Sequence, residues 1–526
     1  YIIWVYIVYN KKENMISKVY SMAVNGLEST RIEIEVDINN WLPSFTIVWL
    51  PDQWIQESKE RLRSAMKSSS FRLPASRITV NLAPADIRKT WPCFDLPIAI
   101  WILANQDFIE TDMLESSLFL WELSLDGKLR KVWGVLPSTL WAKEQGFKRI
   151  FVPKENSLEA SIVSWIDIIP VESLTEVIKI LNKEKPLASA PLLDFSEIAC
   201  SDDKENQKFD FKYVLWQEHA KRALEIAAAW GHNIIMDGPP GSGKTMLSKS
   251  FASILPNFTL DEAVEVSKLY SISWLLDTDN PIIKKRPFRT VHHTASSVSI
   301  VWGWRNAKPW EISLAHKWVL FLDEILEFQK SVLEVLRQPL EDWTITVNRV
   351  NASYEYPAKF TLVWAMNPCP CGYLTDPDKE CICSQKQIEN YRWRLSWPLI
   401  DRVDIFIEVP KVKTEKFHVS DNYDGLETSA DIKKRVQKAR DLQNMRFKNI
   451  WITANSEMTT QEINTFCQLS KESEIILKQA VTNMNLSARA YYRILKLART
   501  IADLGQESDI LVEHIAEALS FRKKES

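Results

Sequence analysis

The segment Gly238, Pro239, Pro240, Gly241, Ser242, Gly243, Lys244 and Thr245 constrains this chain more than any other feature of its sequence. It lies between an apolar run at residues 233–236 and a helix-compatible run that begins at Met246. A strand, a glycine-rich turn and a helix in this order predict a P-loop, because glycines let backbone N–H groups close around phosphates at a helix N-terminus. Lys244 then reaches the β and γ phosphates, and the Thr245 hydroxyl ligates Mg²⁺. We therefore expect ATP and Mg²⁺ at these eight residues.

Two acidic residues follow a second apolar run. Residues 319–322 are apolar, and Asp323 and Glu324 come directly after them, which places both carboxylates at the carboxyl end of a strand. We expect Asp323 to hold Mg²⁺ and Glu324 to polarise the attacking water, as phosphoryl transfer requires. An Asp-Glu pair alone is common at a solvated helix start, but the upstream P-loop favours the catalytic interpretation. A third β run, residues 359–363, leads to Asn367, which is placed to orient the water.

Two arginines are candidate cations for the transferring phosphoryl group. Arg402 follows Leu399-Ile-Asp, and Arg489 lies in Leu486-Ser-Ala-Arg-Ala. A guanidinium can act in its own chain or at a neighbouring subunit. Taken singly, each arginine is better explained by an ordinary ion pair, and spacing alone does not select either as a catalytic residue.

Four of the seven cysteines lie close together, as the pairs Cys369 with Cys371 and Cys381 with Cys383. Four thiolates can close a tetrahedral Zn²⁺ site, although a single intervening residue is tighter than the usual spacing. A reduced loop without metal is the alternative.

Length and charge narrow the class of protein. A chain of 526 residues is long enough for several domains, and its net charge of −3 provides no overall basic field for nucleic acid. No later segment reaches the roughly 20 apolar residues of a membrane span, and the cysteines do not suggest a disulfide framework, so we expect a cytoplasmic protein. We interpret residues 1–14 as upstream translation and Met15 as the start.

Tryptophan is abundant where glycine is expected. The chain has 22 Trp and 12 Gly, whereas ordinary usage predicts about 37 glycines. Trp343 lies in a turn-like segment, Trp397 precedes a proline, and Trp302 and Trp304 flank Gly303. Our hypothesis is that the gene uses UGA for glycine and was translated as if UGA meant tryptophan. A genuinely Trp-rich protein is the alternative.

Pattern changes predict an α/β protein of several parts. Residues 15–183 mix strands (31–36, 77–81) with helices (56–67, 174–182), and residues 184–210 have the polar composition of a linker. Residues 211–410 alternate β runs with helices, as a parallel α/β sheet does. Residues 411–526 are helical in pattern.

Several segments together resemble one family. They are residues 78–86, 286–289, 292–295, 311–316, 336–341, 367–372 and 486–491. They are similar to the ComM/YifB family of magnesium-chelatase-like AAA+ ATPases over nearly the whole chain. The resemblance implies a Lon-protease-like domain at 15–183, a P-loop AAA+ core at 211–410, a helical lid of the magnesium-chelatase C-terminal type at 411–526, and a homo-oligomeric, usually hexameric, ring. It also implies that Asn367 is the first sensor, Arg402 the trans arginine finger and Arg489 the second sensor.

Departures from the family pattern are mostly tryptophan at glycine positions. They are Trp49, Trp216, Trp230, Trp310, Trp318 and Trp397. The P-loop glycines themselves are intact.

Lon-type domains cut peptides with a Ser-Lys dyad. Residues 146–156 resemble the strand and loop after the catalytic helix of such domains, which places Leu136 at the lysine position and Cys93 near the serine position. Without a base, a thiol is a poor nucleophile at neutral pH. We therefore expect a non-catalytic domain and no protease activity.

The resemblance implies a branch-migration helicase that acts on DNA in recombination during uptake of foreign DNA. Arg286, Arg289, His292 and His293, and a hairpin at 343–356 with Arg349, could track a phosphate backbone. They could equally serve packing or subunit contacts. The alternative function is a chelatase-type ATPase that remodels a protein partner during metal insertion.

Overall fold

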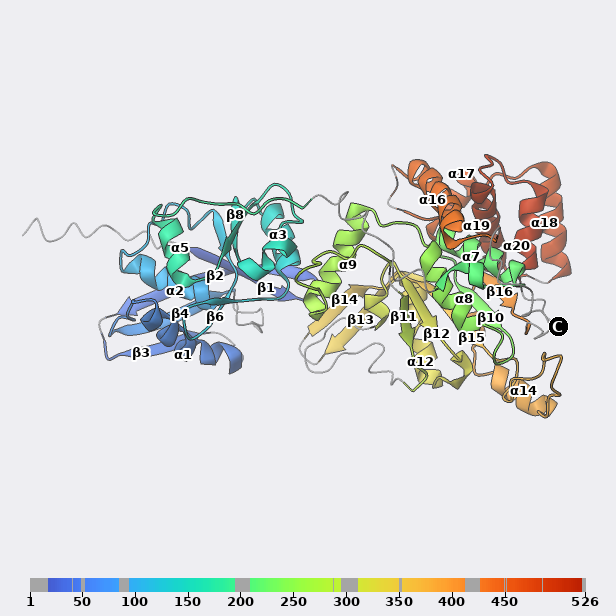
Figure 1. Cartoon of the computed structure of the whole chain (residues 1–526), viewed down its shortest axis with the longest axis horizontal. Helices are drawn as coiled ribbons and strands as arrows, with labels where there is room; N and C mark the ends of the chain where they lie inside the picture. The colour runs from blue at the N-terminus through green and yellow to red at the C-terminus, as the bar shows by residue number, and fades with distance from the viewer. Residues whose placement is uncertain are drawn as a thin grey trace, which may run out of the picture. The chain divides into compact units, whose positions relative to one another are not determined.

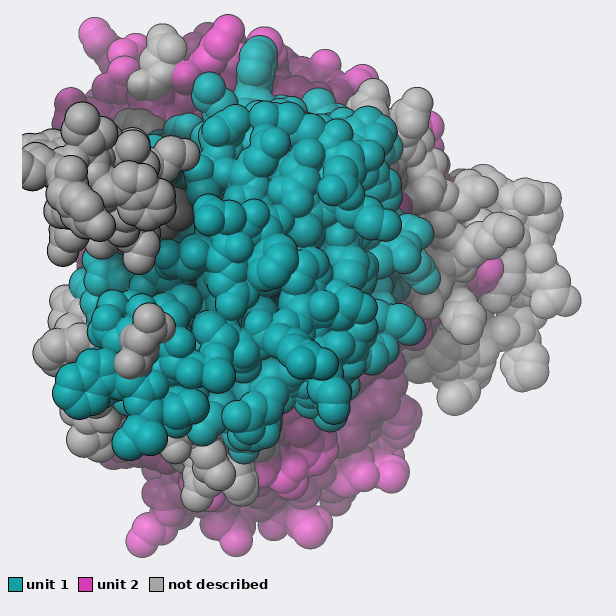
Figure 2. Space-filling view, turned by 90° about the vertical axis from the view of Figure 1, so that its left-hand side faces the viewer, with its two compact units in different colours: residues 1–199, 263–283 teal, residues 200–262, 284–526 magenta. Residues whose placement is uncertain are grey.

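The computed structural model describes residues 18–39, 41–48, 53–84, 94–193, 209–286, 288–294, 311–349, 352–411, 426–448, 450, 452–484 and 486–522. The chain divides into two compact units, which Figure 2 colours separately. Unit 1 comprises residues 1–199 and 263–283, and unit 2 comprises residues 200–262 and 284–526. Each unit has its own sheet and its own hydrophobic core.

Unit 1 is an α+β unit built on a seven-stranded sheet of order β3-β4-β2-β1-β5-β8-β9 (Figure 1). Along β2 the side chains alternate, so that Ile32, Ile34 and Val36 are buried while their neighbours face outward, as a half-buried strand requires. The apolar helix α2 lies against β1 and β2. The elements are β1 (Val19–Asn25), β2 (Glu28–Asn39), β3 (Ser44–Val48), α1 (Gln53–Ser68), β4 (Arg77–Ala83), α2 (Asp95–Asn105), β5 (Ser117–Phe119), β6 (Glu122–Leu123), β7 (Leu129–Arg130), α3 (Val135–Glu144), β8 (Arg149–Pro153), α4 (Ser157–Ala160), β9 (Asp167–Val171) and α5 (Leu174–Leu181).

One segment lies in a different compact unit from the one in which the sequence-based domain boundaries place it. Residues 263–283, which those boundaries assign to the ATPase core, belong to unit 1. They include most of α9 (Leu260–Ser273), in which Ile272 joins the core of unit 1. The Ser271 hydroxyl donates a hydrogen bond to the buried Glu159 carboxylate at 2.6 Å. Boundaries drawn along the sequence could not reveal this, because the contacts join residues 112 positions apart.

Unit 2 contains a five-stranded sheet of order β11-β12-β15-β10-β16 in which all neighbours are parallel. All four residues of β12 are buried, as in parallel sheets covered on both faces. The elements are α7 (Glu218–Trp230), β10 (Ile234–Asp237), α8 (Lys244–Phe251), β11 (Phe288–Val291), α11 (Glu311–Leu314), β12 (Val319–Leu322), α12 (Lys330–Val335), α13 (Arg337–Asp342), β13 (Thr344–Arg349), β14 (Ala352–Pro357), β15 (Thr361–Met366), α14 (Gln385–Arg392), α15 (Trp397–Ile400), β16 (Ile405–Glu408), α16 (Ser429–Arg446), α17 (Thr460–Phe466), α18 (Lys471–Asn483), α19 (Ala488–Leu504) and α20 (Val512–Ser520).

The C-terminal region is helical, as its sequence pattern predicts (Figure 1). Its helices share one continuous core with the sheet, which joins Ile494 and Ile501 of α19 to Val319 and Phe321 of β12. The linear boundary at residue 411 therefore divides two parts that bury apolar surface together. Among the described helices, none is long and apolar enough to cross a membrane.

Among the tryptophans that the structure describes, four have left-handed backbone conformations. Their φ values are 72° at Trp165, 63° at Trp216, 68° at Trp274 and 58° at Trp343. This region costs an L-residue roughly 1–2 kcal/mol and is adopted freely only by glycine. Trp343 follows the last residue of α13, the position at which helices commonly end in glycine. The backbone thus supports the hypothesis that these positions carry glycine in the natural protein.

We predict that Trp343→Gly raises the free energy of unfolding by about 1 kcal/mol, because glycine relieves the left-handed strain. Trp393→Gly is the matched control, since Trp393 also follows a helix and is 80% exposed but has φ of −69°. There glycine only adds backbone entropy to the unfolded chain and should destabilise by about 0.5–1 kcal/mol. Urea unfolding measures both. Peptide sequencing of the natural protein should find glycine at position 343, and tryptophan there would refute the hypothesis.

Candidate active site

The P-loop connects β10 to α8 at the carboxyl edge of the sheet in unit 2. Gly241 and Gly243 have φ of 77° and 89°, and α8 begins directly after Gly243. A Cβ on Gly238 would lie 2.2 Å from the Val409 carbonyl oxygen, so only glycine fits this close approach. The free N–H groups at the start of α8 face the loop, which gives the anion-binding geometry that the sequence predicts.

Lys244 is buried and lies between the P-loop and the end of β15. Its Nζ donates to the carbonyl oxygens of Gly238 and Pro239 at 2.5 and 3.0 Å, and to Oδ1 of Asn367 at 3.3 Å. Burial lowers the pKa of Lys244, and the nearby carboxylates oppose this shift. The fold thus brings together Lys244 and Asn367, which are 123 residues apart in the sequence.

The two acidic residues lie on the other side of the P-loop. The Thr245 hydroxyl donates to Asp323 Oδ2 at 3.1 Å, and the backbone N–H of Glu324 donates to Asp323 Oδ1 at 3.0 Å. A hydroxyl and a carboxylate at this distance are oxygen ligands of the kind that Mg²⁺ prefers. Glu324 has φ of 52°, a strained conformation of the kind that clusters at functional sites.

His293 is a member of this site that sequence reasoning missed. Its Nδ1 lies 3.6 Å from Glu324 Oε2. From the sequence, His293 is a candidate for contact with a phosphate backbone or, equally, for packing or subunit contacts, and not for contact with Glu324. Its position just after β11 could have indicated this role. β11 pairs in parallel with β12, so the residues that follow the two strands lie at the same edge of the sheet.

Gln217 also supports the P-loop, although it lies in no recognisable sequence motif. Its Nε2 donates to the Ser242 carbonyl at 2.7 Å and to the Pro410 carbonyl at 3.4 Å. It therefore ties the loop to the segment that follows β16.

Arg402 and Arg489 lie together, but away from the P-loop of their own chain. Arg402 precedes β16, whose first residue pairs with Ile234 at the start of β10, whereas the P-loop follows the end of β10. The buried Arg402 guanidinium pairs with Glu341. Arg489 Nη2 lies 3.6 Å from the same Glu341, and its Nη1 donates to Asp401 at 2.9 Å. Glu341 pairs with both arginines but is not among the site residues that the sequence predicts.

A cavity of about 630 Å³ opens at this amino-terminal edge of the sheet. Eight basic and four acidic residues line it, so its charge favours anions. The basic residues are Arg286, Lys317, Lys359, Arg402, Arg440, Arg489, Arg493 and Lys496.

Internal contacts account for two of the residues considered as DNA contacts. Arg286 is partly buried, donates to the carbonyl oxygens of Pro256 and Lys317 at 2.8 and 2.9 Å, and pairs with Glu262. Arg289 lies 3.7 Å from Glu311. The expected hairpin is present as β13 and β14, but the side chain of Arg349 lies outside the described residues.

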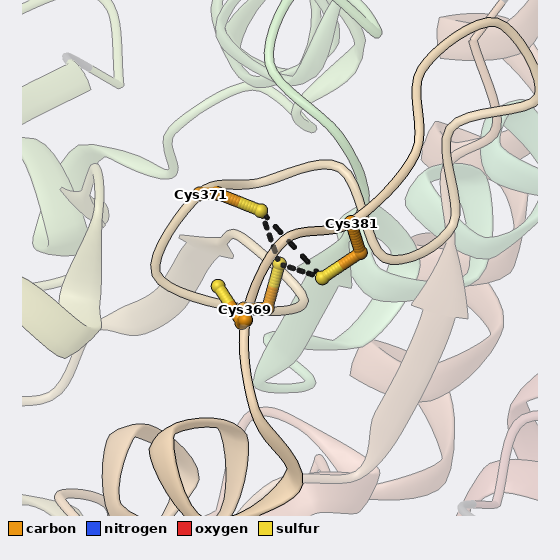
Figure 3. A group of neighbouring side chains, drawn as sticks. Cys369, Cys371 and Cys381 are labelled. Atoms are coloured by element: carbon orange, nitrogen blue, oxygen red, sulfur yellow. Dashed lines mark hydrogen bonds between the residues drawn. The ribbon is translucent and has the colours of Figure 1, made fainter.

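The four cysteines converge between β15 and α14. Their sulfur atoms all lie within 4.8 Å of one another. Cys369 lies 3.3 Å from Cys371 and 3.6 Å from Cys381, and Figure 3 shows the three labelled side chains turned toward one another. Tetrahedral zinc with Zn–S bonds of about 2.3 Å needs sulfurs about 3.8 Å apart, so the group fits this metal. A backbone N–H donated by Tyr373 lowers the pKa of Cys371 to about 6, which favours the ligating thiolate.

In unit 1, Leu136 lies in the first turn of α3 and is fully buried. Its backbone N–H donates to Glu159 at 3.0 Å. A leucine at the position that the resemblance gives to the dyad lysine provides no base. Cys93 lies outside the described residues.

The chain matches known proteins over almost its entire length. The family described as magnesium chelatase, subunit ChlI, matches residues 210–417, a second ChlI family matches residues 34–156, and the ChlI C-terminal family matches residues 426–522. Competence protein ComM of Haemophilus influenzae is 42% identical over 96% of this chain and 97% of its own length. The uncharacterized protein YifB of Escherichia coli is 37% identical over 96% and 97%, respectively. These matches support an ATPase, and the chain belongs to the ComM/YifB family of magnesium-chelatase-like proteins.

Proposed function

We propose that this protein is an ATP-hydrolysing ring motor that acts on DNA as a branch-migration helicase in recombination and natural transformation. The observation that carries the ATPase proposal is the meeting of three strand ends at one edge of the sheet. There Lys244 contacts Asn367 at 3.3 Å and Thr245 contacts Asp323 at 3.1 Å. The P-loop, the acidic pair and the polar sensor lie together as phosphoryl transfer to water requires.

Each group has a proposed role. The P-loop N–H groups and Lys244 hold the phosphates, while Thr245 and Asp323 hold Mg²⁺, which neutralises developing charge on the phosphoryl group. Glu324 accepts the proton of the attacking water, and Asn367 orients that water. The Glu324 carboxylate can contact His293, whose Nδ1 lies 3.6 Å from Oε2, as an alternative to the attacking water.

Arg402 and Arg489 are proposed to act on the nucleotide of a neighbouring subunit. Both lie at the edge of the sheet opposite the P-loop, so in one chain they are remote from the phosphates they would stabilise. A homo-oligomeric ring, for which we propose six subunits, would bring this edge to the next P-loop. Glu341 and Asp401 pair with these guanidinium groups until the nucleotide of a neighbour replaces them.

The proposal that DNA is the substrate is supported more by similar proteins than by the geometry of the site. The ComM relative is named as a competence protein, and a 97-residue segment is 28% identical to the DNA repair protein RadA of Listeria monocytogenes. The alternative, a remodeller of a protein partner, is favoured by the match of residues 210–417 to a magnesium chelatase subunit. The internal contacts of Arg286 also remove one candidate DNA contact.

We also propose that Cys369, Cys371, Cys381 and Cys383 hold a structural Zn²⁺. All four positions would be filled by thiolates, which leaves no open site for catalysis by the metal.

A substitution of Glu324 tests its proposed role as the base. In protein expressed with glycine at the 22 tryptophan positions, Glu324→Gln should lower kcat for ATP by about 100-fold or more and leave ATP binding intact, because the water loses its base. Glu327→Gln is the matched control, since Glu327 pairs with Arg394 at 3.4 Å on the surface.

The same ATPase assay is run with and without single-stranded and branched DNA. Stimulation by DNA that disappears in Glu324→Gln supports the DNA motor. An ATPase rate that DNA does not change favours the protein remodeller.

A mixing experiment tests the action of the arginines between subunits. Lys244→Ala and Arg402→Ala should each be inactive alone, but their mixture should regain ATPase activity. Mixed rings contain interfaces with an intact P-loop from one chain and an intact arginine from the other. A mixture as inactive as its components would place Arg402 in its own chain's site or outside catalysis.

The zinc proposal predicts about one zinc ion per purified chain, measured by elemental analysis. Cys381→Ser should abolish it. Cys467→Ser should retain it, because Cys467 is buried apart from the cluster in the helical region. Intact protein that contains and takes up no zinc would exclude the site.

A further inference from the structure

The loop that carries the cysteines is in contact with the P-loop. Gly372 has φ of 84°, and a Cβ there would lie 2.6 Å from Cδ and 2.7 Å from Cγ of Pro240. Real Cβ atoms essentially never approach other atoms so closely, so the backbone of Gly372 lies directly on the proline ring. Pro240 is the third residue of the eight that form the phosphate-binding loop.

The cysteines hold this contact in place. The Gly372 N–H donates to the Cys369 carbonyl at 2.9 Å, so a single turn connects the first two cysteines to the contact. Cys369 also lies two residues after Asn367, whose side chain bonds Lys244. One short segment therefore carries the sensor, two candidate metal ligands and the contact with Pro240.

The rest of the loop has little other support. From Asn367 to Ser384 the chain forms no helix or strand. Beyond the thiol group, Lys411 restrains the loop through Asp376 and Asp378, at 3.4 and 3.1 Å. Arg392 Nε also donates to the Pro368 carbonyl at 3.3 Å. The pair with Asp378 is exposed, and exposed ion pairs contribute little. Closing such a loop costs conformational entropy, and a metal that joins its two ends supplies the compensating free energy.

We propose that zinc bound at the four cysteines sets the affinity of the ATP site, by holding Gly372 against Pro240 and so keeping the P-loop in its phosphate-binding conformation. This inference rests on the zinc site and the ATP site proposed above. The cysteine group is thereby a metal site that controls nucleotide binding, and loss of the metal releases the P-loop.

The experiment measures zinc content and the Kd for a fluorescent ADP analogue on the full-length protein. Wild type stripped of zinc, and Cys381→Ser, should bind the analogue about 10- to 100-fold more weakly, the loss expected when about one hydrogen bond from the loop to a charged phosphate is broken. Added Zn²⁺ should restore the stripped wild type and not Cys381→Ser.

Gly372→Ala separates the contact from the metal. It should keep its zinc and still lose affinity, because the new methyl group displaces Pro240. Gly146→Ala is the matched control: its φ is 78°, and a Cβ there meets nothing within 4 Å.

Each failure has a distinct signature. Zinc-free protein that binds the analogue as tightly as the zinc-loaded protein would overturn the inference and leave the zinc site standing. Gly372→Ala with wild-type affinity would overturn the route through Pro240. Protein that takes up no zinc would overturn the inference together with the zinc site, while the ATPase assay tests the motor independently. If Cys381→Ser fails to fold, the zinc-stripped wild type and Gly372→Ala still test the inference.

Discussion

The close approach of Gly238 to the Val409 carbonyl is the contact on which the rest of the site depends. The P-loop leaves β10 beside the extension of β16, and the gap between them has no room for a side chain. Gln217 reinforces the same junction through Ser242 and Pro410. Once the loop is held there, the ends of β12 and β15 deliver Asp323 and Asn367 to it, because parallel strands in one sheet end at one edge.

The parallel strand order also places the proposed catalytic residues at two opposite edges of the sheet. Groups that follow strands lie beside the P-loop, whereas Arg402, which precedes β16, lies at the opposite edge with Arg489. A single chain thus carries complementary parts of a site at two edges, and this arrangement is the physical reason for proposing a ring. In the single chain, Glu341 pairs with both arginines and Asp401 pairs with Arg489, so two carboxylates face the two guanidinium groups.

Much of this site could be predicted from the sequence. The P-loop and the acidic strand end are local patterns, so the sequence predicts Lys244, Thr245, Asp323 and Glu324 as site residues. In the structure the Thr245 hydroxyl lies 3.1 Å from Asp323. The strand before the P-loop and the helix after it also occur where expected. Glu341, Gln217 and the role of His293 beside Glu324 were missed, because each acts through a partner distant in sequence and none lies in a spacing pattern. Residues 263–283, which the sequence boundaries place in the ATPase core, lie in compact unit 1, and this too depends on contacts between distant residues.

The sequence by itself determined the local chemistry: a glycine turn that binds phosphate, carboxylates at a strand end, paired cysteines, and tryptophans where glycine is expected. These are properties of neighbouring residues, which short-range geometry and side-chain chemistry decide. Only the tertiary structure decided which groups share a site, which arginines face away from their own P-loop, and that Gly372 lies on Pro240. Those relations depend on strand order and on packing between distant segments, since the free energy that establishes them comes from burial of the whole core and not from any one segment.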